Sequence, residues 1–99
     1  MVSFPKVELT KIPVIDEVDA GILSKTFEHF FKKLPAEAKI HLAFKEYARG
    51  GLSKQHEIHA TLEIDHEKFF ASEEGWKLIS TVQSVLNKLE REVSKKTRR

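Results

Sequence analysis

Hydrophobic and polar side chains alternate in several parts of the chain, and this pattern predicts β-strands. The alternation is typical of a half-buried strand at 7–12, at 40–45 and at 57–64. A fourth, shorter strand is predicted at 68–71. The connection at 47–54 contains a Gly-Gly pair, so it predicts a hairpin between the second and third strands with a basic tip.

Two further segments repeat apolar side chains every three or four residues, as one side of an amphipathic helix does. The first predicted helix covers 17–34, with Asp16 as its N-cap and Pro35 just beyond its end. Asp16 precedes the first apolar position of the repeat, and proline is a stop signal for a helix.

The second predicted helix begins at Ser72 and carries a continuous apolar stripe along its length. With Ser72 as its N-cap, Glu73 and Glu74 fall in the first turn, where the helix dipole favours acidic groups. Trp76 then takes the position from which it packs on Ala71 as a hydrophobic staple.

The predicted order of elements is β-α-β-β-β-α. It describes an α+β fold in which two helices pack on one face of a four-stranded, mainly antiparallel sheet. A chain of 99 residues has room for one hydrophobic core. We therefore expect a single α+β domain over 1–94, followed by a basic C-terminal tail at 95–99.

Charge is distributed unevenly, although the totals are nearly balanced at 17 basic and 15 acidic side chains. Residues 88–99 hold six basic and two acidic groups, a net charge of +4, whereas 57–74 holds one basic and six acidic groups, a net charge of −5. A basic pole of this kind indicates a polyanionic partner, either nucleic acid or an acidic membrane surface. The absence of cysteine excludes disulfides, Cys-ligated zinc and a thiol nucleophile.

Basic side chains also follow one another on the predicted helices. On the last helix, a spacing of four and three residues places one set on the side expected to face away from the core: Lys77, Thr81, Ser84, Lys88, Arg91 and Lys95. Lysine and arginine mixed with hydroxyl side chains suit phosphate binding, but a solvated helix face has the same composition, and the two interpretations stand about even. The residues predicted to contact RNA are Lys25, Lys32, Lys33, Arg49, Lys54, Lys88, Arg91, Lys95, Lys96, Arg98 and Arg99.

Histidines suggest a metal site only weakly. His56 and His59 are three residues apart in a predicted strand, whereas the zinc-protease motif places its histidines four apart on a helix. His41 and His59 share the sheet face away from the core, where two ligands without cysteine make a poor site. We therefore predict no metal, no cofactor and no catalytic residue, since neither a phosphate-binding glycine loop nor a nucleophile elbow is present.

One aromatic side chain is expected on the open face of the sheet, because Phe70 is out of phase with Phe69 and Ala71. Exposed aromatic rings on a sheet stack RNA bases in some proteins. Glu57 and Glu63 share that face and would repel phosphates, so self-association suits Phe70 better.

The last helix and the strand before it resemble the ribosome hibernation-promoting factor family, also called ribosome-associated inhibitors. The run 68–74 resembles the last strand and acidic turn of that family, and 87–96 resembles its closing helix with a basic end. The segments 39–45 and 60–64 resemble its second and third strands, whereas 77–83 keeps the apolar spacing but lacks the acids and tyrosine of the family pattern.

This resemblance implies a fold similar to the double-stranded RNA-binding domain and a non-catalytic protein on the small ribosomal subunit, between the tRNA and mRNA positions. It implies contacts with ribosomal RNA through basic helix faces. Carried over to this sequence, those positions are Lys88, Arg91, Lys95 and Lys96, and by analogy of the first helix Lys25, Lys32 and Lys33.

Two hypotheses remain, and they are compatible. The leading one is an RNA-binding protein that associates with ribosomal RNA and modulates translation. The alternative is a protein–protein interaction module that forms a homodimer through its sheet, and a histidine-based metal enzyme is a weaker third. No secretory signal follows Met1 and no stretch is long enough to span a membrane, so we expect a cytoplasmic protein without a membrane partner.

Overall fold

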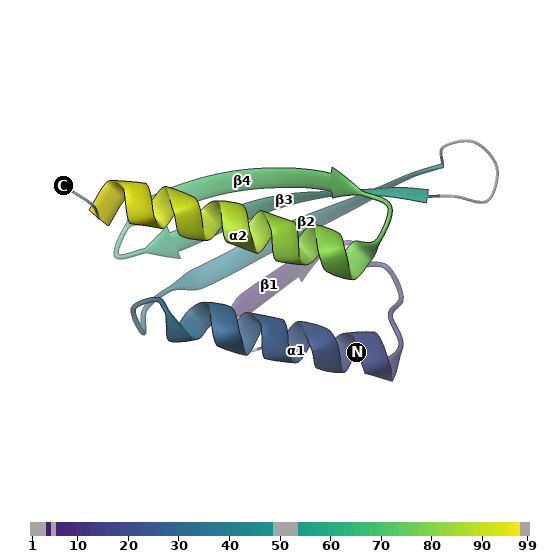
Figure 1. Ribbon diagram of the computed structural model, residues 1–99, viewed down its shortest axis with the longest axis horizontal. Coiled ribbons are helices and arrows are strands. Elements are labelled where there is room, and N and C mark those ends of the chain that lie inside the picture. The colour runs from purple at the N-terminus through teal and green to yellow at the C-terminus, as the bar shows by residue number, and fades with distance from the viewer. Residues whose placement is uncertain (1–3, 5, 49–53, 98–99) are drawn as a thin grey trace.

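The computed structural model describes residues 4, 6–48 and 54–97, which form one sheet and two helices (Figure 1). In chain order the elements are β1 (Val7–Thr10), α1 (Glu17–Lys32), β2 (Lys39–Ala48), β3 (Lys54–Ile64), β4 (Glu67–Gly75) and α2 (Leu78–Thr97). The strand order is β1-β2-β3-β4, with β1 parallel to β2 and the other pairs antiparallel. The predicted α+β fold, with two helices and a four-stranded sheet, is confirmed.

The two helices lie side by side on one face of the sheet and leave the other face open (Figure 1). Alternate side chains of β2 and β3 point toward the helices and are buried: Ile40, Leu42, Phe44, Ile58, Ala60 and Leu62. Opposite them lie Leu23, Phe27 and Phe30 of α1 and Val82, Val85, Leu86 and Leu89 of α2. Burying each of the larger side chains contributes about 1.5–3 kcal/mol, so this single core holds the helices against the sheet.

The N-terminus of α1 is capped as predicted. Asp16 Oδ1 accepts a hydrogen bond of 2.8 Å from the backbone N–H of Asp19. The helix ends at Lys32, two residues before the predicted end, and Pro35 follows after a short turn.

The predicted start of the second helix is wrong. Ser72, Glu73 and Glu74 belong to β4, where they pair with His59, Ile58 and Glu57 of β3. β3 is long enough to offer these residues a complete hydrogen-bond ladder, and that pairing outweighs the local capping preference of Ser72.

The predicted hydrophobic staple is absent for the same reason, since Trp76 lies in the connection after β4 and is 57% exposed. α2 begins at Leu78, without acidic residues in its first turn. At its other end α2 continues through Thr97, so the first three residues of the predicted tail at 95–99 are helical. No helix among the described residues is long and apolar enough to cross a membrane.

Candidate nucleic-acid interface

The polar stripe predicted on α2 does not lie opposite the core. Thr81 is only 3% exposed, and its hydroxyl donates a hydrogen bond of 2.6 Å to the carbonyl oxygen of Lys77. Ser84 is half-buried. α2 packs mainly on β4 and β3, so the sheet covers the flank that carries these residues, and the stripe runs beside β4 instead of facing solvent along its whole length.

Two of the predicted RNA-binding lysines of α2 form ion pairs with carboxylates of β4. Lys88 Nζ lies 3.3 Å from Glu73 Oε2 and donates a hydrogen bond of 3.0 Å to the carbonyl oxygen of Ser72. Lys96 Nζ lies 2.9 Å from Glu67 Oε2. Glu67 and Glu73 are on the helix side of β4, so α2 and the acidic strand meet along a line of partly exposed ion pairs.

Arg91 differs from these lysines, because its exposed guanidinium has no ion-pair partner among the described residues. Arg91 lines two shallow grooves. One, of about 560 Å³, lies on α2 and is lined by Asn87, Glu90, Arg91, Ser94 and Lys95. The other, of about 340 Å³, lies between α2 and β4 and is lined by Phe70, Ala71, Ser72, Lys88, Arg91, Glu92 and Lys95.

Lys95 lines both grooves as well, but its ammonium is 3.4 Å from Glu92 Oε2, one turn earlier on α2. Such an exposed pair within a helix contributes only a few tenths of a kcal/mol, about 0.2–0.5. Lys95 is therefore available to an anion that approaches Arg91.

The RNA-binding residues predicted on the first helix are exposed: Lys25 and Lys32 in α1, and Lys33 as its C-cap. Lys25 is exposed and makes no ion pair within the described part of the chain. Lys32 Nζ is 4.0 Å from Glu28 Oε1 in the same helix. Lys33 Nζ is 3.5 Å from Glu90 Oε2 of α2, so it connects the two helices.

The hairpin contributes one described cation, because Lys54 is exposed at the first position of β3. Arg49, the other predicted RNA-binding residue of this connection, lies outside the described residues, as do Arg98 and Arg99.

The open face of the sheet is less acidic than the sequence of β3 and β4 indicated. Cross-strand pairing places Glu63 between Lys39 of β2 and Lys68 of β4. Glu57, by contrast, lies between Lys45 and a second carboxylate, Glu74. Lys39, Lys45 and Lys68 are thus basic residues of the open face that were not predicted from the sequence. The alternation of side chains within each strand could have placed them there.

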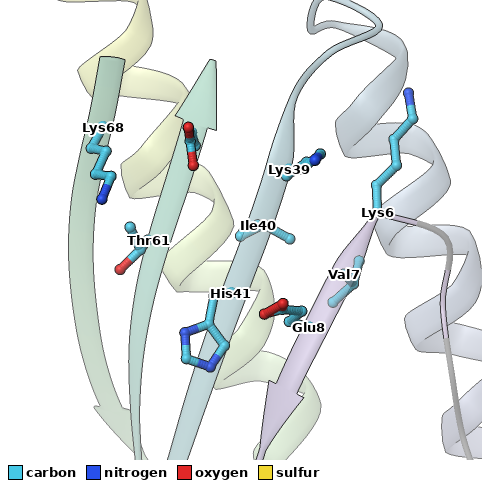
Figure 2. Close-up of a pocket in the computed structure, with 9 residues that line it drawn as sticks. Lys6, Val7, Glu8, Lys39, Ile40, His41, Thr61 and Lys68 are labelled. Atoms are coloured by element: carbon cyan, nitrogen blue, oxygen red, sulfur yellow. The ribbon is translucent and has the colours of Figure 1, made fainter. Parts of the chain in front are cut away.

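A concavity of about 580 Å³ occupies one end of this open face. Figure 2 shows its lining, with Lys39 and His41 on β2, Thr61 on β3 and Lys68 on β4. Lys6 lines its rim but points away from the other side chains, and its Nζ donates a hydrogen bond of 2.7 Å to the carbonyl oxygen of Ala36.

The two open-face histidines are not directly opposite each other. His41 pairs with Thr61 and His59 pairs with Ala43. His41 Nε2 lies 2.6 Å from the hydroxyl of Thr10, and His59 Nε2 lies 3.4 Å from Glu57 Oε1. Within residues 4, 6–48 and 54–97, no three side chains of His, Asp or Glu gather as a metal site would require.

The carboxyl group of Glu57 on this face has a lowered pKa. The hydroxyl of Tyr47 donates a hydrogen bond of 2.9 Å to Glu57 Oε1, and this bond lowers the pKa of the carboxyl group. His59 and, more distantly, Lys45 lower the same pKa further. Glu57 is thus held in its ionised form by its own neighbours.

Comparison with known proteins finds similarity in the fold but none in sequence families. No protein-family model matches the sequence, and no curated protein sequence matches it. Among solved structures, a ribosomal subunit interface protein from Coxiella burnetii matches with a TM-score of 0.64 and 20% identity, over 94% of this chain and 98% of that chain. The chain has the fold of a ribosomal subunit interface protein.

A second solved structure agrees. The N-terminal domain of Protein Y from Thermus thermophilus has a TM-score of 0.63 and 10% identity, over 90% of this chain and 93% of that domain. Both structures therefore support the predicted α+β fold of two helices and a four-stranded sheet, and each likeness extends over 90% or more of this chain.

Proposed function

We propose that this chain binds ribosomal RNA on the small ribosomal subunit and modulates translation by occupying a site there, without catalysing a reaction. Its fold supports the proposal, because the structure from Coxiella burnetii is that of a ribosomal subunit interface protein and covers 94% of the chain. A ribosome-bound protein works in the cytoplasm, which is the location we propose. The further likeness to a double-stranded RNA-binding domain is part of the same proposal.

The observation that carries the proposal is the position of Arg91. A guanidinium without an acidic partner binds phosphate in bidentate fashion, and here it borders two grooves that also contain lysine, serine or asparagine donors. The remaining predicted RNA-binding residues belong to the same proposal: Lys25, Lys32, Lys33, Arg49, Lys54, Lys88, Lys95, Lys96, Arg98 and Arg99.

Co-sedimentation with ribosomal particles on sucrose gradients, at low and high salt, tests the proposal. The wild-type chain should travel with the small subunit at low salt and be released at high salt, since phosphate contacts are salt-dependent. A variant with Lys88→Ala, Arg91→Ala and deletion of 95–99 should remain at the top of the gradient. Lys45→Ala removes one exposed lysine from the open face and controls for the loss of a single positive charge outside the proposed site. Unchanged co-sedimentation of the triple variant would contradict the proposal.

A second candidate function is pairing of two copies through the open sheet face. The observation in its favour is Phe70, which points away from the helices, as predicted, and is 67% exposed. Sedimentation equilibrium between about pH 5.5 and 8, across the usual titration range of histidine, tests it. A strict monomer throughout that range would exclude such a homodimer.

A further inference from the structure

Phe70 occupies an unusual place in this fold, because its strand is the outer edge of the sheet. β4 pairs with β3 on one side only, and Phe70 pairs there with Thr61. Its side chain is 67% exposed on the open face, and the residue is one of those that line the groove between β4 and α2. Because β4 is an edge strand, this exposed ring lies at the border between the open face and the groove beside α2.

The cations of that same groove are the ones that the proposed function uses. Lys88, Arg91 and Lys95 line it together with Phe70, and Glu92 is the acidic residue in the lining. Glu92 is 3.4 Å from Lys95, and Glu73 is 3.3 Å from Lys88, so Arg91 supplies the uncompensated charge. The groove thus joins an exposed aromatic ring to a net positive charge.

Glu57 and Glu63 share the open face with Phe70 and were expected to repel RNA phosphates there. The pairing of the strands gives each of them a neighbour that offsets or binds its charge. Glu63 pairs with Lys68 at the position two residues along β4 from Phe70. Glu57 is bound by the hydroxyl of Tyr47 and lies opposite Glu74, four residues from Phe70 on β4. Neither carboxylate lines the groove that Phe70 shares with Arg91.

We propose that this groove binds one unpaired nucleotide of RNA, with its base stacked on Phe70 and a flanking phosphate held by Arg91 and Lys95. This inference rests on the proposed function and adds the form of RNA that is recognised. Bases stack on aromatic rings only when they are free of their own helix, whereas phosphates are present in any RNA. The volume of about 340 Å³ and the position of the groove at the edge of the sheet suit one nucleotide.

Fluorescence anisotropy with two labelled RNAs tests the inference: a hairpin with an unpaired loop, and a fully paired duplex of the same stem. Phe70→Leu should weaken binding of the hairpin by about 5- to 30-fold, the lower range for loss of one base–aromatic stack, and should change duplex binding less than about twofold. Phe70→Tyr should retain the affinity of the wild type.

Trp76→Leu is the matched control, because Trp76 is also an exposed aromatic residue but lies in a separate groove with Lys77, Ser80 and Ser84. It should bind both RNAs as the wild type does. Arg91→Ala should weaken both RNAs, since the phosphate contact does not depend on base pairing.

The outcomes separate this inference from the proposed function. If Phe70→Leu binds the hairpin like the wild type while Arg91→Ala weakens both RNAs, the stacking site is overturned and RNA binding stands. If Phe70→Leu only converts a dimer into a monomer, the ring serves self-association and the inference fails. A wild-type chain that binds neither RNA would overturn both.

Discussion

Lys88 of α2 and Glu73 of β4 form an ion pair of 3.3 Å at the border of the groove that contains Arg91. The two side chains are 47% and 30% exposed, so the pair contributes at most about 1 kcal/mol to stability. Its larger effect concerns binding, because a carboxylate beside Lys88 competes with RNA phosphate for the same ammonium group.

Glu73→Gln should therefore raise the affinity for RNA by a few-fold, with little change in the free energy of unfolding. Titration of labelled RNA by fluorescence anisotropy measures this change. Glu37→Gln is the matched control, since Glu37 is exposed in the turn before β2 and makes no ion pair within the described residues. If Glu73→Gln weakened binding, the carboxylate would be positioning Lys88 for RNA instead of competing with it.

The salt dependence of RNA binding should reveal how many phosphates are contacted. Arg91→Ala should make the slope of log affinity against log salt concentration shallower by about 1, the amount expected for one lost phosphate contact. Lys45→Ala removes the same charge from the open face and should leave the slope unchanged. Equal effects of the two substitutions would show that only the net charge matters.

The elements that could be predicted from sequence are those with a single strong pattern. The alternation in 40–45 and 57–64 identified β2 and β3, and the repeat in 17–34 with Asp16 identified α1 and its cap. In each case local preference and tertiary packing agree, so the pattern was sufficient.

Residues 72–74 could not be assigned correctly from the local sequence. Ser-Glu-Glu is a good start for a helix, but it is also a possible continuation of a strand when a partner of the right length is available. β3 provides that partner, and nothing in the local sequence reveals how far its ladder extends. The same limit applies to the pairs Glu73–Lys88 and Glu67–Lys96, which exist only because α2 packs along β4.

The corner between β4 and α2 depends on Gly75. A Cβ atom added there would overlap the hydroxyl of Thr81, whereas one added at Gly21 in α1 would meet nothing within 4 Å. Gly75→Ala should therefore destabilise the fold by about 1–3 kcal/mol, as overpacking does. Gly21→Ala should stabilise it by about 0.5–1 kcal/mol, because glycine disfavours a helix interior.

Urea unfolding of both variants measures the two effects, which have opposite signs for the same chemical change. Adding Thr81→Ala to Gly75→Ala removes the overlapping hydroxyl and should recover part of the loss, although the hydrogen bond to the Lys77 carbonyl is then missing. A Gly75→Ala variant as stable as the wild type would show that the corner adjusts to the extra methyl group.

The hydrogen bond between Tyr47 and Glu57 should make stability depend on pH in the acidic range. Because it lowers the pKa of Glu57 in the folded state, its contribution is present above the usual pKa of glutamate. The contribution is lost as the pH falls through the lowered value, where the folded chain also takes up the proton. Tyr47→Phe should raise the pKa of Glu57 toward its usual value and flatten the fall in stability over this interval.

Carbon-detected NMR titration of the Glu57 carboxyl group measures the pKa, and urea unfolding at a series of acidic pH values measures the stability. Glu57→Gln provides the reference background, since it removes the group that titrates while keeping its size. In that background Tyr47→Phe should leave the pH dependence unchanged. If Tyr47→Phe flattened the curve equally with and without Glu57, another group would be responsible for the acid sensitivity of this face.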